Sequence, residues 1–465
     1  MLFLFLKLIA INPATDIKTI FLHAVAAVHP QQLMQHNVHV RVSNNFQEDG
    51  HATRVSRIIN ISGDDYALPH DGRIWVIGAG KAAAAMAQEL ENILGKHFPL
   101  QGMVVTKYGH ALPLQQLTLI EAGHPVPDQN SVAASVKLLE IAAQVQPADL
   151  VIFLLSGGAS ALLADVPAGS SLPEVQQLFE ALLKSGATIQ EMNTVRKHIS
   201  YIKGGQLAKS IYPATLCTLI LSDVPGDDLT VIGSGPTVPD PTTFADTMAI
   251  LRKYHLPEKI SQNLLQHIKN GIAGKIPDTA KPGGDDFRHV HNYLTGTNLI
   301  ALEAAAQKAR ALGYHPQLIS STTTGDAHTV AAAYIQQALS YAGPLPACLL
   351  MGGETTVQVT GNGLGGRNQH LALAAGIALA DHPQLTFLSG GTDGTDGPTD
   401  AAGAIVDAHT MKGAIKLQLD ANSFLQRNDA WHFFSKAGGL LVTGPTQTNV
   451  MDLMIVLITA GTSKI

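Results

Sequence analysis

The chain has 465 residues, of which 46% are hydrophobic and 14% are charged. This is more apolar material than one ordinary core holds, so we expect two domains. A net charge of −6 argues against a clustered basic surface, and therefore against a nucleic-acid partner. The two cysteines, Cys217 and Cys348, lie in apolar runs, which favours buried thiols in a reducing cytoplasm over a disulfide framework.

The chain begins with an apolar run over residues 1–9 that is too short to span a bilayer as a helix. Lys7 lies inside this run and no small-residue cleavage site follows it, which argues against a signal peptide. We therefore interpret residues 1–12 as an extension ahead of the first domain, with a membrane-directing role as the weaker alternative. The protein is expected to be cytoplasmic, with no membrane partner.

In the first half of the chain, helical and strand patterns alternate. A helix is predicted over residues 15–29, with Thr15 or Asp16 as its cap. Apolar strands are predicted at residues 73–77, 102–105, 148–155 and 216–221, with helices beginning near Ala82 and Ala159. Strands that are apolar on both faces and alternate with helices predict an α/β fold with a parallel sheet. Ligands of such folds bind at the carboxyl ends of the strands.

A stretch rich in Pro, Asp and Gly begins at Pro236 and contains helical patterns at residues 244–254 and 260–272. We place the domain boundary at its start. This gives a Rossmann-like domain over residues 13–236 and a second α/β domain, with a mixed sheet, over residues 237–465. The second domain is expected to hold strands at 291–294, 346–351 and 385–388 and a helix at 299–312.

The strand predicted at residues 73–77 continues through Gly78 and Gly80 to Lys81 and leads directly into a helix. Glycines let the backbone approach an anion, and a helix N-terminus offers free N–H groups, so a phosphate or carboxylate site is predicted. A tight turn with a solvated lysine is the structural alternative. A dinucleotide loop is a rival, but it expects an acidic residue after the next strand, where Lys107 stands. This disfavours NAD and leaves NADP open.

Two further segments of the first half point to anion binding. The strand that ends in Ser156, Gly157 and Gly158 repeats the strand–glycine–helix pattern. Residues 191–205 place Arg196 and Lys197 on one predicted helix, where a solvated basic face is the equally weighted alternative. Asn193 is interpreted as a ligand-binding residue or as a helix cap.

Acidic residues follow the strand at 216–221, at Asp223, Asp227 and Asp228. Carboxylates on a short loop suit Mg²⁺, which takes one or two of them together with substrate phosphates. An aspartate here is also able to accept a proton from a substrate hydroxyl, whereas polar turn residues are the structural alternative. Ser234 and Gly235 follow and offer further backbone donors.

The second half of the chain places Arg367 in a glycine-rich segment, 361–369, downstream of Glu354. An arginine among glycines is able to present its planar fork to phosphate oxygens. A polar loop at 390–400 carries Asp393, Asp396 and Asp400, which are interpreted as Mg²⁺ or hydroxyl ligands, with a plain Asp–Gly turn as the alternative.

Taken in order, these segments resemble the glycerate 2-kinases of the MOFRL type over nearly the whole chain. The matching segments are residues 76–82, 155–158, 193–198, 222–228, 234–240, 353–356, 365–369, 391–400, 428–429 and 442–452. The resemblance implies two α/β domains, with ATP and glycerate meeting in the cleft between them. It also implies transfer of the γ-phosphoryl group to the C2 hydroxyl of D-glycerate. The chain is expected to be a monomer or homodimer.

The resemblance further implies that Lys81 and Arg367 are essential and that Asp223 is catalytic, so that the alanine variants of Lys81 and Arg367 are expected to fold normally and lose activity. The residues expected to bind substrate or nucleotide are Gly78, Gly80, Ser156, Gly157, Gly158, Asn193, Arg196, Lys197, Ser234, Gly235, Glu354, Asn368, Asp393, Asp396, Thr443 and Asn449, with Asp227 and Asp228 as Mg²⁺ ligands. The first alternative is an NAD(P)H-dependent hydroxypyruvate reductase. The second is a non-catalytic sensor of nucleotides or sugar acids.

Overall fold

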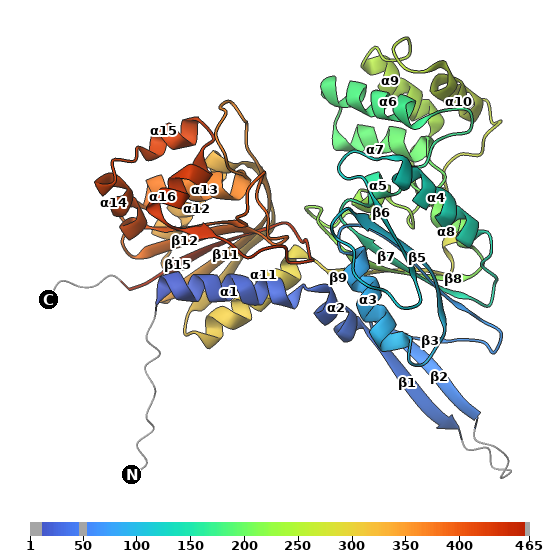
Figure 1. Cartoon of the computed structure of the whole chain (residues 1–465), viewed down its shortest axis with the longest axis horizontal. Coiled ribbons are helices and arrows are strands. Elements are labelled where there is room, and N and C mark those ends of the chain that lie inside the picture. Colours follow the sequence, from blue (N-terminus) through green and yellow to red (C-terminus); the bar gives the residue numbers. More distant parts are fainter. Residues whose placement is uncertain (1–11, 46–53, 461–465) are drawn as a thin grey trace. The chain divides into compact units, whose positions relative to one another are not determined.

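The computed structural model describes residues 12–45 and 54–460, which form two compact units (Figure 1). Unit 1 joins the N-terminal segment, up to His29, to the segment from Gly296 onward, and unit 2 is Pro30–Thr295. This division differs from the predicted one, which placed a single boundary at residue 236. The predicted extension, residues 1–12, lies almost entirely outside the described residues.

Unit 2 is built on a six-stranded parallel sheet in the order β6-β5-β4-β7-β8-β9, which confirms the predicted fold class. Its strands are β4 (Ile74–Ala79), β5 (Leu100–Lys107), β6 (Thr118–Ala122), β7 (Leu150–Ser156), β8 (Thr215–Leu221) and β9 (Val290–Gly296). Strands β4 and β7 are buried along their whole length, because helices cover both faces of the sheet. Cys217, on β8, is a buried free thiol, as predicted.

Helices cover the two faces of this sheet. The helix α3 (Ala83–Leu94) packs on one face, and α2 (Pro30–Asn37) packs beside it. The other face holds a core that includes Phe153 and Leu138, under α4 (Gln129–Ala142), α5 (Ala159–Leu162) and α8 (Gln206–Ile211). A small antiparallel sheet of β1 (Val38–Asn45), β2 (Arg54–Ile61) and β3 (Asp64–Ala67) completes this part of unit 2.

A layer of helices with its own core lies at one end of unit 2 (Figure 1). Its members are α6 (Leu172–Lys184), α7 (Ile189–His198), α9 (Phe244–Lys253) and α10 (Gln262–Ile272). Leu182, Leu251 and Ile268 are fully buried between them. Because α9 and α10 bury their apolar faces against α6 and α7, residues that the sequence assigned to the second domain belong to unit 2.

Unit 1 contains a mixed six-stranded sheet in the order β10-β11-β15-β12-β13-β14, as predicted for the C-terminal half. Its strands are β10 (His315–Asp326), β11 (Ala347–Thr356), β12 (Leu385–Gly391), β13 (Gly403–Asp407), β14 (Leu440–Leu441) and β15 (Asp452–Ile458). The last strand in the sequence, β15, pairs antiparallel with both β11 and β12. The C-terminal strand therefore lies inside the sheet, where every one of its residues is buried.

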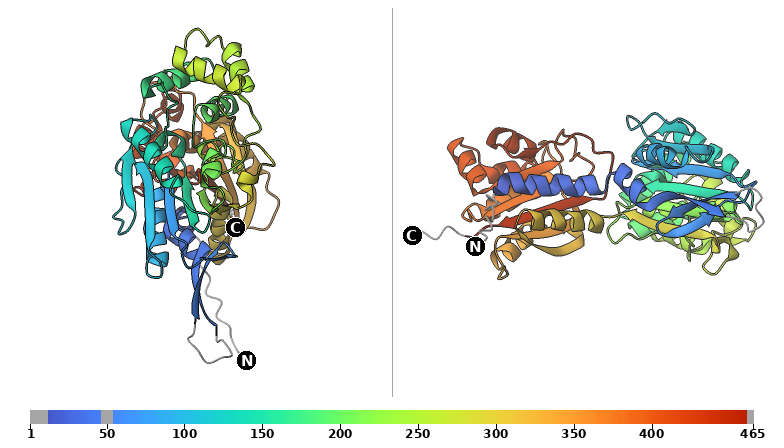
Figure 2. Two further views of the ribbon diagram at one scale, coloured as in Figure 1. Left: turned by 90° about the vertical axis from the view of Figure 1, so that its right-hand side faces the viewer. Right: turned by 90° about the horizontal axis from the view of Figure 1, so that it is seen from below.

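Two helices that are far apart in the sequence lie side by side on one face of this sheet (Figures 1 and 2). They are α1 (Pro13–Ala27) and α11 (Asn298–Ala311). Helix α1 begins two residues before the predicted start because Asn12, rather than Thr15 or Asp16, is its N-cap and Pro13 occupies the first turn. The Tyr314 hydroxyl donates to Asp16 at 2.9 Å, which ties α1 to unit 1.

The opposite face of the unit 1 sheet carries the remaining helices over a core that includes Phe387, Phe433 and Tyr334. These helices are α12 (Ala327–Leu339), α13 (Arg367–Leu379), α14 (Ala408–Lys416), α15 (Ala421–Gln426) and α16 (Ala430–Ala437). Cys348, on β11, is the second buried free thiol. Over the described ranges, none of the helices has the length and apolarity needed to cross a membrane.

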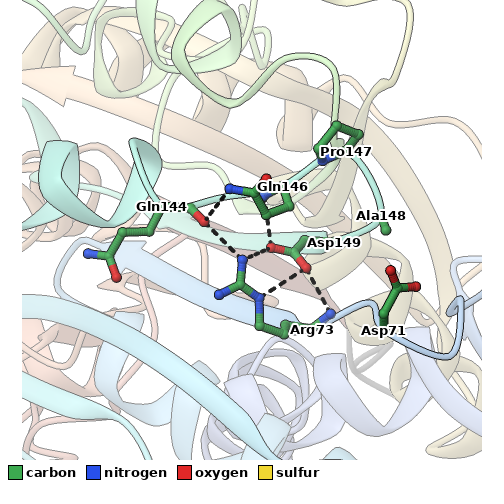
Figure 3. Close-up of a pocket in the computed structure, with 7 residues that line it drawn as sticks. All are labelled: Asp71, Arg73, Gln144, Gln146, Pro147, Ala148 and Asp149. Carbon is green, nitrogen blue, oxygen red and sulfur yellow. Dashed lines mark hydrogen bonds and ion pairs between the residues drawn. The ribbon is translucent and has the colours of Figure 1, made fainter.

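A polar depression at the amino ends of β4 and β7 is organised by the Asp149 carboxylate (Figure 3). Asp149 is 3% exposed and accepts from Arg73 Nη2 at 2.8 Å, Trp75 Nε1 at 2.9 Å and the Gln146 backbone N–H at 2.9 Å. Burial alone would raise the pKa of Asp149, but these hydrogen bonds outweigh it and lower the pKa. The depression lies opposite the predicted ligand-binding end of the sheet, and its contacts hold the two strands together.

We predict that Asp149→Asn destabilises the protein by roughly 2–3 kcal/mol, somewhat less than for a fully buried pair because the Arg73 side chain is 39% exposed. The folded-state pKa of Asp149 lies below its unfolded value of about 3.8, so its stabilisation is present above that pH and is lost as the pH falls. Urea unfolding at pH 7 and pH 3 measures both effects. If the free energies of unfolding of wild type and variant differ by the same amount at the two pH values, the ionised Asp149 carboxylate does not stabilise the fold as described.

Candidate active site

In unit 2, the loops that follow β4 and β7 are joined at the carboxyl ends of these strands. The Lys81 backbone N–H donates to the Gly157 carbonyl at 2.9 Å, and the Ala82 N–H donates to Ser156 Oγ at 3.0 Å. Gly80 has a φ of 139°, and a Cβ at this position would lie 2.0 Å from Ser156 Oγ. The two predicted glycine loops therefore form one structure, and the Lys81 side chain passes beside Gly158.

Asp223, in the loop after β8, packs directly against this structure. A Cβ at position 157 would lie 1.7 Å from Asp223 Oδ2, so that only glycine allows the carboxylate to take this place. Gly157 thus contacts Lys81 through its carbonyl and Asp223 through its α-carbon. The structure brings together the lysine and the aspartate that the resemblance marks as catalytic. Gly78 lies within β4, where a Cβ would be 2.8 Å from Val104, and this gives it a packing role.

His124 is a further member of this site that the sequence did not reveal. A Cβ at Gly158 would lie 2.9 Å from His124 Nε2 and 3.5 Å from Lys81 Cγ, so the imidazole and the lysine flank the same glycine. Burial, followed by the positive charges of Lys81 and Lys107, lowers the pKa of His124 to about 4. His124 is therefore neutral at physiological pH, and the lysines make this end of the sheet electropositive. Nothing in the local sequence around His124 signals this proximity.

The basic residues of the segment 191–205 divide into two groups. The helix is capped by Thr188 rather than Asn193, and it ends at His198, so that the predicted helix over 191–205 is too long. The Lys197 ammonium is buried against Asp240 at 3.5 Å, and Lys203 is buried against Asp165 at 3.3 Å. These two lysines therefore pair with carboxylates of their own unit.

Arg196 differs from them, because none of the carboxylates in the described part of the chain pairs with it. Its Nη1 donates to Asn193 Oδ1 at 2.6 Å. Ser234 Oγ donates to the same oxygen at 3.1 Å, which places Asn193, Arg196 and Ser234 in one cluster. Gly235 has a φ of 66° and turns the chain after this serine.

The two predicted Mg²⁺ ligands have different surroundings. Asp228 Oδ1 accepts from the backbone N–H and the hydroxyl of Thr230, each at 2.8 Å, as in a polar turn. Asp227 Oδ1 is buried and has no hydrogen-bond partner. In the part of the chain that the structure describes, no group of three or more His, Cys, Asp or Glu side chains is arranged to hold a metal. Of these two aspartates, Asp227 is the one with an unpaired buried oxygen that fits a cation.

In unit 1, Arg367 begins α13 and pairs with two carboxylates. Its Nε donates to Asp452 Oδ2 at 2.6 Å and its Nη2 to Asp452 Oδ1 at 3.0 Å, while Nη1 donates to Glu354. Asp452 is 1% exposed, so Arg367 neutralises a buried charge. Burial would lower the pKa of Arg367, but the hydrogen bonds and charges of Asp452 and Glu354 raise it. The sequence did not identify Asp452 as the partner, since it lies 85 residues away.

Asp396 lies next to this pair, at the N-terminus of α13. Its carboxylate accepts from the backbone N–H groups of Asn368 at 3.0 Å and Gln369 at 2.8 Å. A Cβ at Gly366 would lie 2.2 Å from Asp396 Oδ1, so that glycine is required for this approach. Burial, together with the charge of Asp452, raises the pKa of Asp396 to about 6 despite the two backbone donors.

The other predicted residues of unit 1 order the loops around this centre. Asp393 Oδ1 accepts from the Thr395 N–H at 3.0 Å, and Asp400 Oδ1 accepts from Trp431 Nε1 at 2.9 Å. Thr443 Oγ1 lies 3.0 Å from the position of a Cβ at Gly394, which brings the 391–400 loop against the loop after β14. Asn449 Oδ1 accepts from the Met451 N–H at 3.1 Å. Their roles in binding stay predictions.

Comparison with known proteins places these features in a family. A domain of unknown function, DUF4147, matches residues 16–269, and the MOFRL family matches residues 347–452. The chain is 41% identical over 408 residues to the glycerate 2-kinase of Pyrococcus horikoshii, covering 86% of this chain and 90% of that protein. It is 42% identical over 392 residues to the D-glycerate 2-kinase of Thermotoga maritima, covering 83% and 91%.

Solved structures agree with the sequence relatives. The crystal structure of glycerate kinase from Thermotoga maritima matches with a TM-score of 0.82 at 38% identity, over 96% of this chain and 99% of that chain. A crystal structure of a Pyrococcus horikoshii protein matches with a TM-score of 0.81 at 38% identity, over 97% and 99%. The shared fold, motifs and length show that the chain belongs to the MOFRL-type glycerate kinase family.

Proposed function

We propose that this chain is a glycerate 2-kinase, which transfers the γ-phosphoryl group of ATP to the C2 hydroxyl of D-glycerate and releases 2-phosphoglycerate and ADP. The observation that supports this most directly is the joining of the two glycine loops around Lys81, with Asp223 packed against Gly157. A cation beside two glycine loops suits a phosphate, and a neighbouring carboxylate suits a hydroxyl acceptor.

Phosphoryl transfer depends mainly on positioning and on neutralisation of charge, with no covalent enzyme intermediate. In the proposed reaction, Lys81 stabilises the charge on the transferred phosphoryl group. Asp223 accepts the proton of the C2 hydroxyl as the oxygen attacks phosphorus, and ADP leaves. His124, being neutral, is able to accept or donate a hydrogen bond beside Lys81 without adding charge.

In this proposal, Arg367 pairs with carboxylates of its own unit and also binds the substrate. Three of its five N–H groups are donated to Asp452 and Glu354, which hold the guanidinium in a fixed orientation at the start of α13. The remaining two N–H groups are available to a phosphate or carboxylate oxygen.

Mg²⁺ is the metal expected with ATP, and Asp227 is the residue that we propose as its ligand. One protein carboxylate together with phosphate oxygens is a usual set for Mg²⁺, so a larger acidic cluster is not required. When bound, the ion would neutralise charge on the nucleotide phosphates.

The alternative activity is the reduction of hydroxypyruvate with NAD(P)H. Two relatives from Agrobacterium vitis, each 41% identical over 396 residues, bear a provisional hydroxypyruvate reductase name. The strand β5 ends in Lys107, where a dinucleotide fold would place an acidic residue for the ribose hydroxyls. This observation argues against NADH and leaves NADPH as the cofactor of the alternative activity.

A paired assay on the purified chain tests the proposal. One arm supplies ATP, Mg²⁺ and D-glycerate, and asks whether the product enters an enolase-coupled reaction without a mutase. The other arm supplies hydroxypyruvate with NADH or NADPH. We expect ADP and 2-phosphoglycerate in the first arm and no oxidation of the cofactor in the second. Oxidation of NADPH without ADP formation would overturn the proposal.

We predict that Lys81→Ala lowers kcat/KM by roughly 10³-fold or more, because the charge that stabilises the transferred phosphoryl group is removed. Its melting temperature is expected to remain within about 2 °C of wild type, since Lys81 is partly exposed and takes part in none of the ion pairs formed by the described residues. Lys209→Ala, on the exposed side of α8, is the matched control. Near wild-type turnover in Lys81→Ala would contradict the role of this lysine.

The sequence led us to expect that Arg367→Ala folds normally, and the structure changes this expectation. Because this substitution leaves Asp452 buried without a counter-charge, we predict a loss of stability of about 3–5 kcal/mol in addition to the loss of activity. The double variant Arg367→Ala/Asp452→Asn is expected to regain most of the stability in urea unfolding, yet remain inactive. Recovery of activity in the double variant would show that Arg367 serves only the structure.

A further inference from the structure

Arg196 is a partly buried cation without a carboxylate partner among the described residues, and its side chain contacts an aromatic ring and an amide oxygen. Its guanidinium lies 4.7 Å from the centroid of the Phe179 ring, and Nη1 donates to Asn193 Oδ1 at 2.6 Å. Its neighbours Lys197 and Lys203 are each paired with an aspartate. Within the described residues, Arg196 has no such ion pair.

The charge of Arg196 is therefore partly desolvated, and no carboxylate of the described residues compensates it. Burial lowers its pKa to about 10, and no carboxylate acts in the opposite direction, yet the group remains charged at neutral pH. Taking a charge out of water is costly unless an opposite charge accompanies it. Such an arrangement is expected where a ligand brings the negative charge.

Asn193 supplies a second unpaired donor at the same place. The residue is 4% exposed, and its Oδ1 is saturated by donors from Arg196 and from Ser234 Oγ at 3.1 Å. These contacts fix the amide so that Nδ2 is its remaining polar group, and this nitrogen is buried with no hydrogen-bond partner. A buried donor left unpaired costs about 1–3 kcal/mol. The Arg196 guanidinium and Asn193 Nδ2 are both donors, and Asn193 Oδ1 holds them together. A ligand group with two acceptor oxygens fits such a pair.

This donor pair is connected to the proposed reaction centre. Ser234 Oγ is 2.9 Å from Ser160 Oγ, and Ser160 lies in α5, which begins directly after Gly157 and Gly158. The same glycines contact Lys81 and Asp223. A short hydrogen-bonded chain thus leads from Arg196 to the loop where phosphate and hydroxyl chemistry is proposed.

We propose that Arg196 and Asn193 bind the carboxylate of the acceptor substrate and thereby select a 2-hydroxy acid over a neutral polyol. The guanidinium fork and Nδ2 match the two oxygens of a carboxylate, whereas Lys81 and the glycine loops serve the phosphates. This inference rests on the proposed function for the identity of the acid. The donor pair itself is observed independently of that function.

The decisive variant is Asn193→Asp, which keeps the shape and Oδ1 of the side chain but replaces Nδ2 with a negative oxygen. It gives Arg196 an internal counter-charge at the place proposed for the substrate. We expect the melting temperature to be unchanged or raised, KM for D-glycerate to rise about 100-fold, and KM for ATP to stay within about twofold. Asn422→Asp, exposed on α15 in unit 1, is the matched control.

Two substitutions of Arg196 complete the test. Arg196→Lys keeps the charge but loses the planar fork, so KM for D-glycerate is expected to rise about tenfold, and Arg196→Gln is expected to raise it about 100-fold. A rise in KM for ATP with KM for D-glycerate unchanged would place a phosphate here instead and overturn the proposal. Unchanged constants for both substrates in Asn193→Asp would also overturn it.

Calorimetric titration without ATP separates this inference from the kinase assignment. The wild-type chain is expected to bind D-glycerate but not glycerol, and Asn193→Asp is expected to bind neither. If the wild type binds D-glycerate in this Asn193-dependent way but transfers no phosphoryl group, the carboxylate site stands and the kinase proposal fails. If it phosphorylates D-glycerate while Asn193→Asp binds it with wild-type affinity, the carboxylate site is refuted and the kinase stands.

Discussion

The close approach of acidic and hydroxyl side chains to glycine backbone is the constraint on which both candidate centres depend. In unit 2, Asp223 occupies the space that a side chain at position 157 would fill, and in unit 1 Asp396 does the same at position 366. Each glycine lies where a strand end or a helix start exposes backbone polar groups. Any larger residue would push the carboxylate away, so the glycines set the geometry of the charged groups and do more than shape turns.

Charge pairing is the second principle of the structure. In both units, cations pair with buried carboxylates from distant parts of the chain, as in the pairs of Lys197 with Asp240 and of Arg367 with Asp452. Such pairs are costly to break but add little net stability, so their value lies in orienting side chains. Arg196 differs from these cations because no carboxylate of the described residues pairs with it. An unmet requirement of this kind is a stronger sign of ligand binding than basic composition.

The proposed work of the protein is divided between the two units. Unit 2 carries the glycine loops, Lys81, Asp223 and the Arg196–Asn193 donor pair, while unit 1 carries Arg367, held by Asp452 and Glu354. Phosphoryl transfer needs little covalent chemistry and much neutralisation of charge, which suits the cations that each unit carries. A neutral His124 beside Lys81 adds hydrogen-bonding capacity without adding repulsion.

The sequence by itself determined most strands of the parallel sheet and two of the mixed sheet, the glycine loops and the family, because these depend on local periodicity, turn chemistry and motifs in a fixed order. It identified Lys81, Asp223 and Arg367 as candidates. Only the tertiary structure showed that α1 packs on unit 1, that β15 lies inside its sheet, and that Asp452 neutralises Arg367. It also separated Lys197, which is paired, from Arg196, which is not. Neighbouring residues of one helix look alike in a sequence, since what distinguishes them is which distant carboxylate the fold brings within reach.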